Sequence, residues 1–395
     1  MQHPAAPLDE MANVPPMTGL QELLDSSSAA DTDPRWTELS QQPATQGLRG
    51  TLNQIGLSLP PAKAELERRR QQYHQEQAEA QAAAQARQRE AEERARQEAE
   101  AQRQQQIQQT RLEHRRREEQ EQRRLIQTNF QGCRTILVAN PKGGSRKTTS
   151  TWLLAATLGI IRGGGVIAWD ANETMGSLGE RSIQDMHSRT VVDLLEQAAH
   201  QFDSVDGNRL GTLDRFVRSQ QDAHFSVLAS DEDATRQDIV DDEGFDRVHE
   251  ILSRFSRMIL VDTGNNIRAS HFLAAVETAD QLVIPIAAGH DSANAAHKMM
   301  RALSAAGHAD LVRSAVVLIH DLEPTADADH EYIDTVKAIA TDLEDQVAAI
   351  VPIPFDNALK GGGQIRYDTL TPATQRAYTH AAAAVATTLR RTTLT

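Results

Sequence analysis

Hydrophobic positions divide the chain into three segments with different patterns. Residues 1–60 contain seven prolines and few large apolar side chains, so they cannot bury enough surface to offset the entropy cost of ordering. This pattern predicts a disordered N-terminal arm. Leucine and isoleucine residues recur at helical spacing near positions 20–24 and 48–57, where either a partner-docking helix or a short local helix would fit.

The second segment, residues 61–130, is composed almost entirely of Gln, Glu, Arg and Ala. It has neither proline nor glycine between Ala62 and Gln127, which predicts one helix of roughly 100 Å at 1.5 Å per residue. Large apolar residues are too sparse for a Leu/Ile heptad seam. We therefore expect a solvated helix stabilised by Glu–Arg pairs, with coiled-coil pairing through alanines left open.

The third segment, residues 131–395, alternates short β-branched runs with helical patterns of 10 to 20 residues. Continuously apolar strands alternating with helices predict an α/β domain with a mostly parallel, doubly wound sheet covered on both faces. Seven such runs are present: Thr135–Ala139, Val166–Trp169, Phe225–Leu228, Met258–Val261, Leu282–Ile286, Ala315–Ile319 and Ala349–Ile353.

Composition narrows the functional classes. The 395 residues carry a formal net charge of −14 and a single cysteine, which excludes a disulfide framework, a Cys-rich zinc site and a self-contained iron–sulfur scaffold. The first ten residues lack the basic and apolar pattern of a signal sequence, and the chain has no membrane-spanning apolar run. A cytoplasmic protein is expected. The alanine-rich C-terminal helix, Ala373–Arg391, does not resemble a membrane anchor.

Arginine clusters raise the question of nucleic-acid binding. Residues 131–395 carry 24 basic and 35 acidic side chains, which weighs against a DNA-binding surface there. A local patch for non-specific DNA or an acidic partner stays open, and so does the alternative of an ordinary solvated face. The candidate side chains are Arg68, Arg69, Arg70, Arg115, Arg116, Arg117, Arg123, Arg124, Arg376, Arg390 and Arg391.

A phosphate-binding loop is the motif that carries chemistry. The first predicted strand leads into Asn140-Pro141-Lys142-Gly143-Gly144-Ser145-Arg146-Lys147-Thr148-Thr149 and then a helix. Loop amides and a helix N-terminus attract anions, so Lys147 would contact the β and γ phosphates and Thr148 would bind Mg²⁺. Pro141 and Arg146 occupy the two glycine positions of the ordinary P-loop. A tight strand-to-helix turn is the alternative.

The sequence Lys-Gly-Gly-x-x-Lys-Thr-Thr resembles the deviant Walker A motif of the ParA/MinD family of partition and positioning ATPases. The resemblance implies a P-loop NTPase fold, ATP and Mg²⁺ as cofactors, and a homodimer in the ATP state. It makes Lys142 the signature lysine that reaches the other subunit's nucleotide, and Lys147 a second catalytic lysine. The nucleotide would bind Lys142, Gly143, Gly144, Ser145, Arg146, Lys147, Thr148 and Thr149.

Three further matches extend this resemblance. Asp170 stands where the family has the first acid of an Asp-x-Asp switch, but Asn172 replaces the second acid, which organises the attacking water. An amide cannot take a proton, although its carbonyl can orient water. Asp262 resembles the Walker B acid, so Thr148, Asp170 and Asp262 are the implied metal ligands. Pro354 and Asp356 resemble the family's segment beside adenine. Helix capping is the alternative for acids at strand ends.

Arg146 has two interpretations. If its φ is positive it costs on the order of 1 kcal/mol, and its side chain either points outward or brings positive charge to the phosphates. A narrower resemblance to actinobacterial plasmid ParA-like proteins and to MinD-like accessory ATPases of type VII secretion rests on segments such as 169–179 and 370–374.

Partitioning or positioning of plasmid or chromosome DNA, or of other cargo, by a slow ATP hydrolase is therefore the leading expectation. A protein partner or centromere-binding adaptor would bind through the arm or the long helix. The alternative is a nucleotide-responsive adaptor of a secretion or conjugation apparatus with little hydrolysis. A small-molecule ligase or kinase on the same scaffold is a third possibility.

Overall fold

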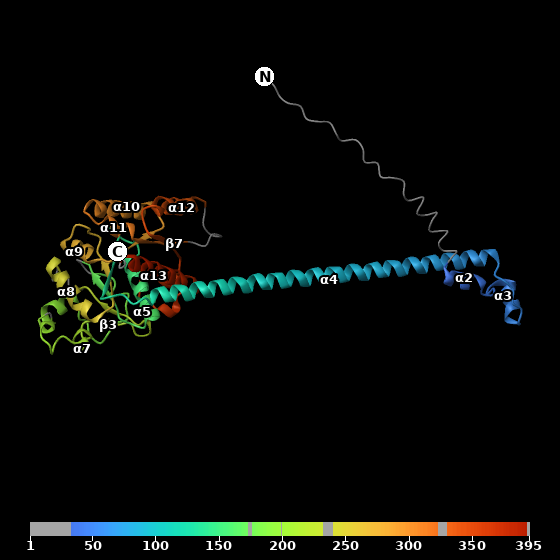
Figure 1. Cartoon of the computed structure of the whole chain (residues 1–395), viewed down its shortest axis with the longest axis horizontal. Helices are drawn as coiled ribbons and strands as arrows, with labels where there is room; N and C mark the ends of the chain where they lie inside the picture. The colour runs from blue at the N-terminus through green and yellow to red at the C-terminus, as the bar shows by residue number, and fades with distance from the viewer. Residues whose placement is uncertain (1–32, 173–175, 199, 232–239, 323–329, 393–395) are drawn as a thin grey trace, which may run out of the picture. The chain divides into compact units, whose positions relative to one another are not determined.

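The computed structural model describes residues 33–172, 176–198, 200–231, 240–322 and 330–392 (Figure 1). The leucines near positions 20–24 lie outside these residues. The chain forms two compact units that divide within one long helix: residues 1–111 and residues 112–395. That helix, α4, runs without interruption over Lys63–Ile126. The long helix predicted from composition is confirmed.

The first unit differs from the expected disorder over residues 33–60. Helices α2 (Pro34–Gln41) and α3 (Gly47–Gln54) form there, and Asp33 caps α2 by accepting a hydrogen bond from the Arg35 amide at 2.8 Å. Trp36 of α2 packs on Tyr73 of α4, with ring centroids 5.8 Å apart, and both side chains are buried. The apolar surface that residues 33–60 lack on their own is therefore supplied by the beginning of α4.

Polar contacts complete this small N-terminal core. Glu65 is buried and accepts hydrogen bonds from the Thr45 amide at 2.8 Å and the Thr45 hydroxyl at 2.9 Å. Arg69 donates to the carbonyl oxygens of Leu39 and Pro43 and to the Glu65 carboxylate. These bonds satisfy buried polar groups that would otherwise destabilise the fold. Except for the bond between Arg69 and Glu65, they join positions 20 to 30 residues apart, which a local pattern does not show.

The second unit is built on an eight-stranded sheet with the order β3-β4-β2-β5-β1-β6-β7-β8. All neighbouring strands are parallel except the edge pair of β3 and β4. The seven predicted runs are confirmed as β1 (Arg134–Val138), β2 (Val166–Ala171), β4 (Ser226–Leu228), β5 (Met258–Thr263), β6 (Gln281–Ala287), β7 (Val316–Leu322) and β8 (Ala349–Pro354). The two-residue strand β3 (Arg218–Ser219) is additional.

Helices cover both faces of this sheet, as the α/β pattern predicts (Figure 1). One face packs against α8 (Asp242–Phe255), α9 (Ser270–Thr278), α10 (His290–Ala305), α11 (Ala309–Arg313) and α12 (His330–Glu344). The other packs against α5 (Lys147–Arg162), α13 (Pro372–Thr392) and the end of α4, where Ile126 is fully buried. Short helical elements lie at α6 (Val191–Asp193), η2 (Leu194–Ala198), η3 (Gln201–Asp203), α7 (Leu210–Leu213), η4 (Gln221–Ala223), η5 (Asn357–Leu359) and η6 (Tyr367–Thr369).

Strand order places the candidate chemistry at one edge of the sheet. β1 pairs with β5 on one side and β6 on the other, and β2 pairs with β5. The carboxyl ends of these parallel strands lead into the glycine-containing loop, Asp170 and Asp262, and Asp170 is the register partner of Asp262. Ligands of open α/β sheets bind at this edge. Within the described residues, no helix is long and apolar enough to cross a membrane.

Candidate nucleotide-binding site

The loop after β1 turns into α5 through two residues in the left-handed region. Gly144 has a φ of 77° and Arg146, which precedes the first residue of α5, has a φ of 72°. Arg146 therefore adopts the conformation that favours glycine, at a cost on the order of 1 kcal/mol. Its side chain lines the pocket at this loop.

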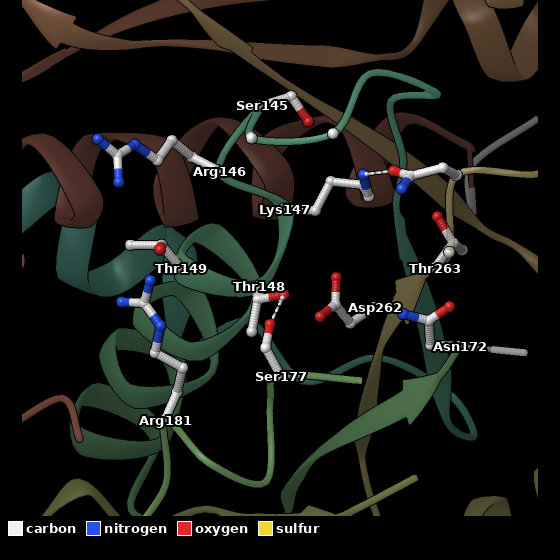
Figure 2. A pocket seen from close by; sticks show the side chains of 14 residues that line it. Ser145, Arg146, Lys147, Thr148, Thr149, Asn172, Ser177, Arg181, Asp262 and Thr263 are labelled. Carbon is white, nitrogen blue, oxygen red and sulfur yellow. Dashed lines mark hydrogen bonds between the residues drawn. The ribbon is translucent and has the colours of Figure 1, made fainter. Parts of the chain in front are cut away.

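Figure 2 shows that pocket, a polar cavity of about 240 Å³. It is lined by Gly143, Gly144, Ser145, Arg146, Lys147, Thr148, Thr149, Asn172, Ser177, Arg181, Asp262, Thr263, Gly264 and Asn265. Seven of the expected loop residues, 143–149, are thus brought together with Asn172 and Asp262. Lys142, Asp170, Pro354 and Asp356 do not line it.

Lys147 is held by oxygen atoms of the loop and of Asn265, which follows β5. Its Nζ donates to the Asn140 carbonyl at 2.8 Å, to the Lys142 carbonyl at 3.3 Å and to Oδ1 of Asn265 at 2.7 Å. Burial lowers the pKa of Lys147, and the nearby Asp262 carboxyl opposes that shift. A desolvated ammonium with neutral acceptors is stabilised more strongly by a charged acceptor, and a phosphate would supply one.

Asp262 and Thr148 form the part of the pocket suited to a cation. Asp262 is buried at the end of β5, and its Oδ1 has no hydrogen-bond partner within the described chain. Thr148 accepts a hydrogen bond from the Ser177 hydroxyl at 3.0 Å. An orphaned carboxylate oxygen beside a hydroxyl fits Mg²⁺, which takes one or two protein oxygens and fills its remaining positions with phosphate and water. The described residues contain no group of three His, Cys, Asp or Glu side chains that could hold a metal ion.

Asp170 lies behind this position and holds the following loop. Its carboxylate accepts hydrogen bonds from the Leu178 amide at 3.1 Å and the Asn172 amide at 3.3 Å. A Cβ on Gly176 would stand 2.1 Å from both carboxylate oxygens, so only glycine fits there. Its oxygens are thus engaged by Asn172 and Leu178, and Asp170 does not line the pocket.

The two buried acids have raised pKa values. Burial raises the pKa of Asp262 to about 8, with the neighbouring Asp170 carboxyl as the second cause. Burial likewise raises the pKa of Asp170 to about 6, against hydrogen bonds from Leu178 and Ser230. Two carboxylates on adjacent strands resist ionising together. A cation bound at Asp262 would relieve this repulsion.

A pH prediction follows from the Asp262 pKa. The folded state holds the Asp262 proton up to about pH 8, whereas the unfolded chain releases it near pH 3.8, so stability falls as pH rises between these values. Asp262→Asn imitates the protonated form. Without nucleotide and Mg²⁺, the variant should gain stability over the wild type from pH 5 to pH 8, by up to about 1.4 kcal/mol per pH unit. Thermal denaturation measures this, and parallel pH profiles would contradict it.

Lys142 stands outside the pocket. Its Nζ lies 3.2 Å from Oδ2 of Asp291 in the first turn of α10, and both side chains are largely exposed. A surface pair of this kind contributes at most about 1 kcal/mol. Lys142 is therefore available to another ligand at little cost.

The segment expected beside adenine is separate from the phosphate pocket. Asp356 accepts hydrogen bonds from the amides of Ala358 and Thr371 at 3.0 and 2.9 Å, and from the Thr371 hydroxyl at 3.0 Å. Burial raises the pKa of Asp356, but these hydrogen bonds outweigh it and the net shift is downward. Asp356 thus caps η5 and holds the turn before α13. Pro354 ends β8, and neither residue lines the loop pocket.

Asn265 and Arg181 of the pocket fall outside the motifs singled out in the sequence, and Ser177 lies in segment 169–179 without an assigned role there. Asn265 follows Asp262-Thr263-Gly264, so its place next to that motif was a usable signal. Ser177 and Arg181 come from the connection after β2, and only the folded chain brings them to Thr148 and Thr149 (Figure 2).

The chain has relatives among known sequences and neighbours among solved structures. No family model matches the sequence. The ESX-1 secretion-associated protein EspI from two Mycobacterium tuberculosis strains, CDC 1551 and H37Rv, is 26% identical over 263 residues, which are 66% of this chain. The match spans only 37% of the length of those relatives.

Structural neighbours of the chain are ParA/MinD-family ATPases. The ATP complex of a McdA variant from Cyanothece has a TM-score of 0.49 and 18% identity, over 65% of this chain and 97% of that one. A ParA family ATPase from Chlorobium tepidum has a TM-score of 0.47 and 16% identity, over 67% of this chain and 98% of that one. The cell division ATPase MinD from Pyrococcus furiosus has a TM-score of 0.47 and 20% identity, over 66% of this chain and 99% of that one.

Proposed function

We propose that this chain is a ParA/MinD-like ATP hydrolase that turns over slowly and dimerises in its ATP state. One observation carries the proposal: the loop between β1 and α5 brings Lys147, Thr148 and the orphaned carboxylate oxygen of Asp262 into one pocket. Amides at a helix N-terminus, a buried ammonium and a carboxylate with one oxygen that lacks a hydrogen-bond donor suit a nucleotide phosphate with Mg²⁺.

The chain's own residues would divide the work as follows. Lys147 would exchange its contacts with Asn140 and Asn265 for phosphate oxygens, and Thr148 and Asp262 would hold Mg²⁺, which would supply charge neutralisation of the phosphates. Asn172, at the Asp262 end of the pocket in Figure 2, orients the attacking water through its carbonyl oxygen. Asp170 fixes the backbone of Asn172 through a hydrogen bond and keeps this end of the pocket ordered.

The cellular role we propose is partitioning or positioning of plasmid DNA, chromosome DNA or other cargo in the cytoplasm. The N-terminal core and α4 would carry the protein partner or centromere-binding adaptor, because they present a long exposed helix and four exposed apolar residues, Leu48, Leu52, Ile55 and Leu57. The basic side chains of Arg117, Arg124 and Arg390 line one cavity, which supports a local contact with non-specific DNA.

A second role is favoured by a different observation. The sequence similarity to the ESX-1 secretion-associated protein EspI supports a nucleotide-responsive adaptor of a secretion or conjugation apparatus with little hydrolysis. Asn172, in place of a water-organising acid, fits that role as well.

Nucleotide binding and phosphate release by the full chain test the proposal. ATP should bind with Mg²⁺ and be hydrolysed, and duplex DNA should accelerate phosphate release if the protein partitions DNA. Tight binding with negligible release, with or without DNA, would favour the adaptor. Absence of nucleotide binding would contradict both roles.

Substitution of Asn172 tests the assignment of slow chemistry. An acid at this position can accept a proton as well as orient water, so Asn172→Asp should raise turnover, by roughly a hundredfold if the missing group costs about 3 kcal/mol. The lifetime of the ATP-bound dimer should shorten in parallel. Single-turnover phosphate release measures this, with Asn266→Asp, two residues beyond Gly264, as a matched control. Unchanged turnover in Asn172→Asp would move the role to another group.

A further inference from the structure

Arg181 reaches the pocket from a backbone that is fixed on both sides. Its amide donates to the Ser177 carbonyl at 3.1 Å, and its carbonyl accepts a hydrogen bond from the Ile365 amide at 2.8 Å. Figure 2 shows its guanidinium beside Thr149, on the same side of the pocket as Arg146 and away from Asp262 and Asn172. Two guanidinium groups from distant parts of the sequence therefore lie on one side of the pocket.

No carboxylate of the described residues forms an ion pair with Arg181. Burial lowers the pKa of Arg181, and the like charge of Arg146 lowers it further, while Glu180 opposes the shift. An arginine stays protonated under such conditions. A half-buried guanidinium that faces a like charge and has no ion pair of its own favours an anion beside it, because a bridging anion removes the repulsion and restores lost solvation.

The direction of the loop indicates which anion. In a P-loop the lysine reaches the β and γ phosphates, while the backbone amides around it cradle the α and β phosphates. Thr149 is two residues beyond Lys147 and stands on the side opposite Asp262 and Asn172 (Figure 2). A phosphate bound beside Thr149 is therefore one that nucleoside diphosphates and triphosphates both contain.

We infer that Arg181, together with Arg146, forms a second anion-binding position of the nucleotide pocket that takes the α and β phosphates of a nucleoside diphosphate or triphosphate. The inference rests on the proposed function, since it concerns the same pocket. Arg146 then supplies a charge at the position where the ordinary P-loop has glycine. Binding, and not the γ-phosphate chemistry, is the step to which Arg181 contributes.

Calorimetric titration of the full chain with ADP and with ATP, in Mg²⁺, tests this position. Arg181→Ala should weaken ADP and ATP to the same extent, by about 10- to 100-fold, because it removes charge-assisted contacts that both ligands make. The affinity of Arg181→Lys for both nucleotides should lie between those of Arg181→Ala and the wild type. Arg209→Ala is the matched control, since Arg209 is exposed and pairs only with Asp206 among the described residues. Thermal denaturation shows that each variant is folded.

Two results would overturn the inference alone: unchanged ADP affinity in Arg181→Ala, or a loss confined to ATP, which would assign Arg181 to the γ-phosphate. Failure of the wild type to bind either nucleotide would instead overturn the proposed function and the inference with it. Arg146→Gly gives a second check that does not depend on Arg181→Ala folding. It should weaken ADP binding, because it removes the second guanidinium from a backbone position that glycine readily adopts, and thermal denaturation shows that the variant is folded.

Discussion

Lys147→Ala should abolish measurable nucleotide binding. The ammonium of Lys147 is buried at the pocket and is held by three neutral oxygens, which phosphate oxygens would replace. Loss of charge-assisted hydrogen bonds worth about 3 kcal/mol lowers affinity by roughly a hundredfold or more. Calorimetric titration with ADP and with ATP measures the loss.

A matched control for this variant is Lys337→Ala on α12, where the lysine is exposed and makes a weak surface pair with Asp334. It should bind nucleotide like the wild type. Because Lys147 is buried, thermal denaturation must accompany the titration. A folded Lys147→Ala protein that binds ATP with nearly normal affinity would show that the loop between β1 and α5 is not the phosphate site.

Lys142→Ala should separate binding from dimerisation. The Lys142 side chain does not line the pocket and is held only by an exposed pair with Asp291, so its removal should leave ATP affinity within about threefold of the wild type. If Lys142 reaches the nucleotide of a second subunit, the variant should lose ATP-dependent dimerisation and turnover. Titration with ATP, light scattering and phosphate release together measure the three properties.

Asp291→Ala is the natural companion of Lys142→Ala, because it removes the other member of the same ion pair and leaves the lysine in place. We expect Asp291→Ala to keep its ATP-dependent dimer. If both variants lose the dimer equally, the ion pair itself holds the loop in its productive form. Retention of the dimer by Lys142→Ala would remove Lys142 from the interface.

The sequence pattern predicts the sheet because its strands are local and strongly apolar. A run such as Met258–Val261 is continuously apolar and fully buried, so the local composition alone identifies it as a strand. The edge strand Arg218–Ser219 has only two residues and no such signal. The sequence pattern predicts disorder over residues 33–60, because it does not show that Trp36 packs on Tyr73 of α4.

Site residues that lie in a local motif are predictable from the sequence, and those that depend on the folded chain are not. Residues 143–149 lie in one contiguous motif, and the structure brings them to a single pocket with Asn172 and Asp262. Asp170 also ends its strand as expected, but its carboxylate is enclosed by a glycine and two amides that come later in the chain. The sequence does not identify Arg181, because its place at the pocket depends on where the connection after β2 folds back.

The central claim is a dimer that forms only with ATP, and the mass of the full chain in solution tests it most directly. Light scattering should give the monomer mass of 43.5 kDa without nucleotide and with ADP, and twice that mass with ATP and Mg²⁺. Lys142→Ala should stay at the monomer mass in all three conditions, which separates the ATP dimer from self-association of α4. A wild-type protein that binds ATP yet keeps one mass in every condition would contradict the claim.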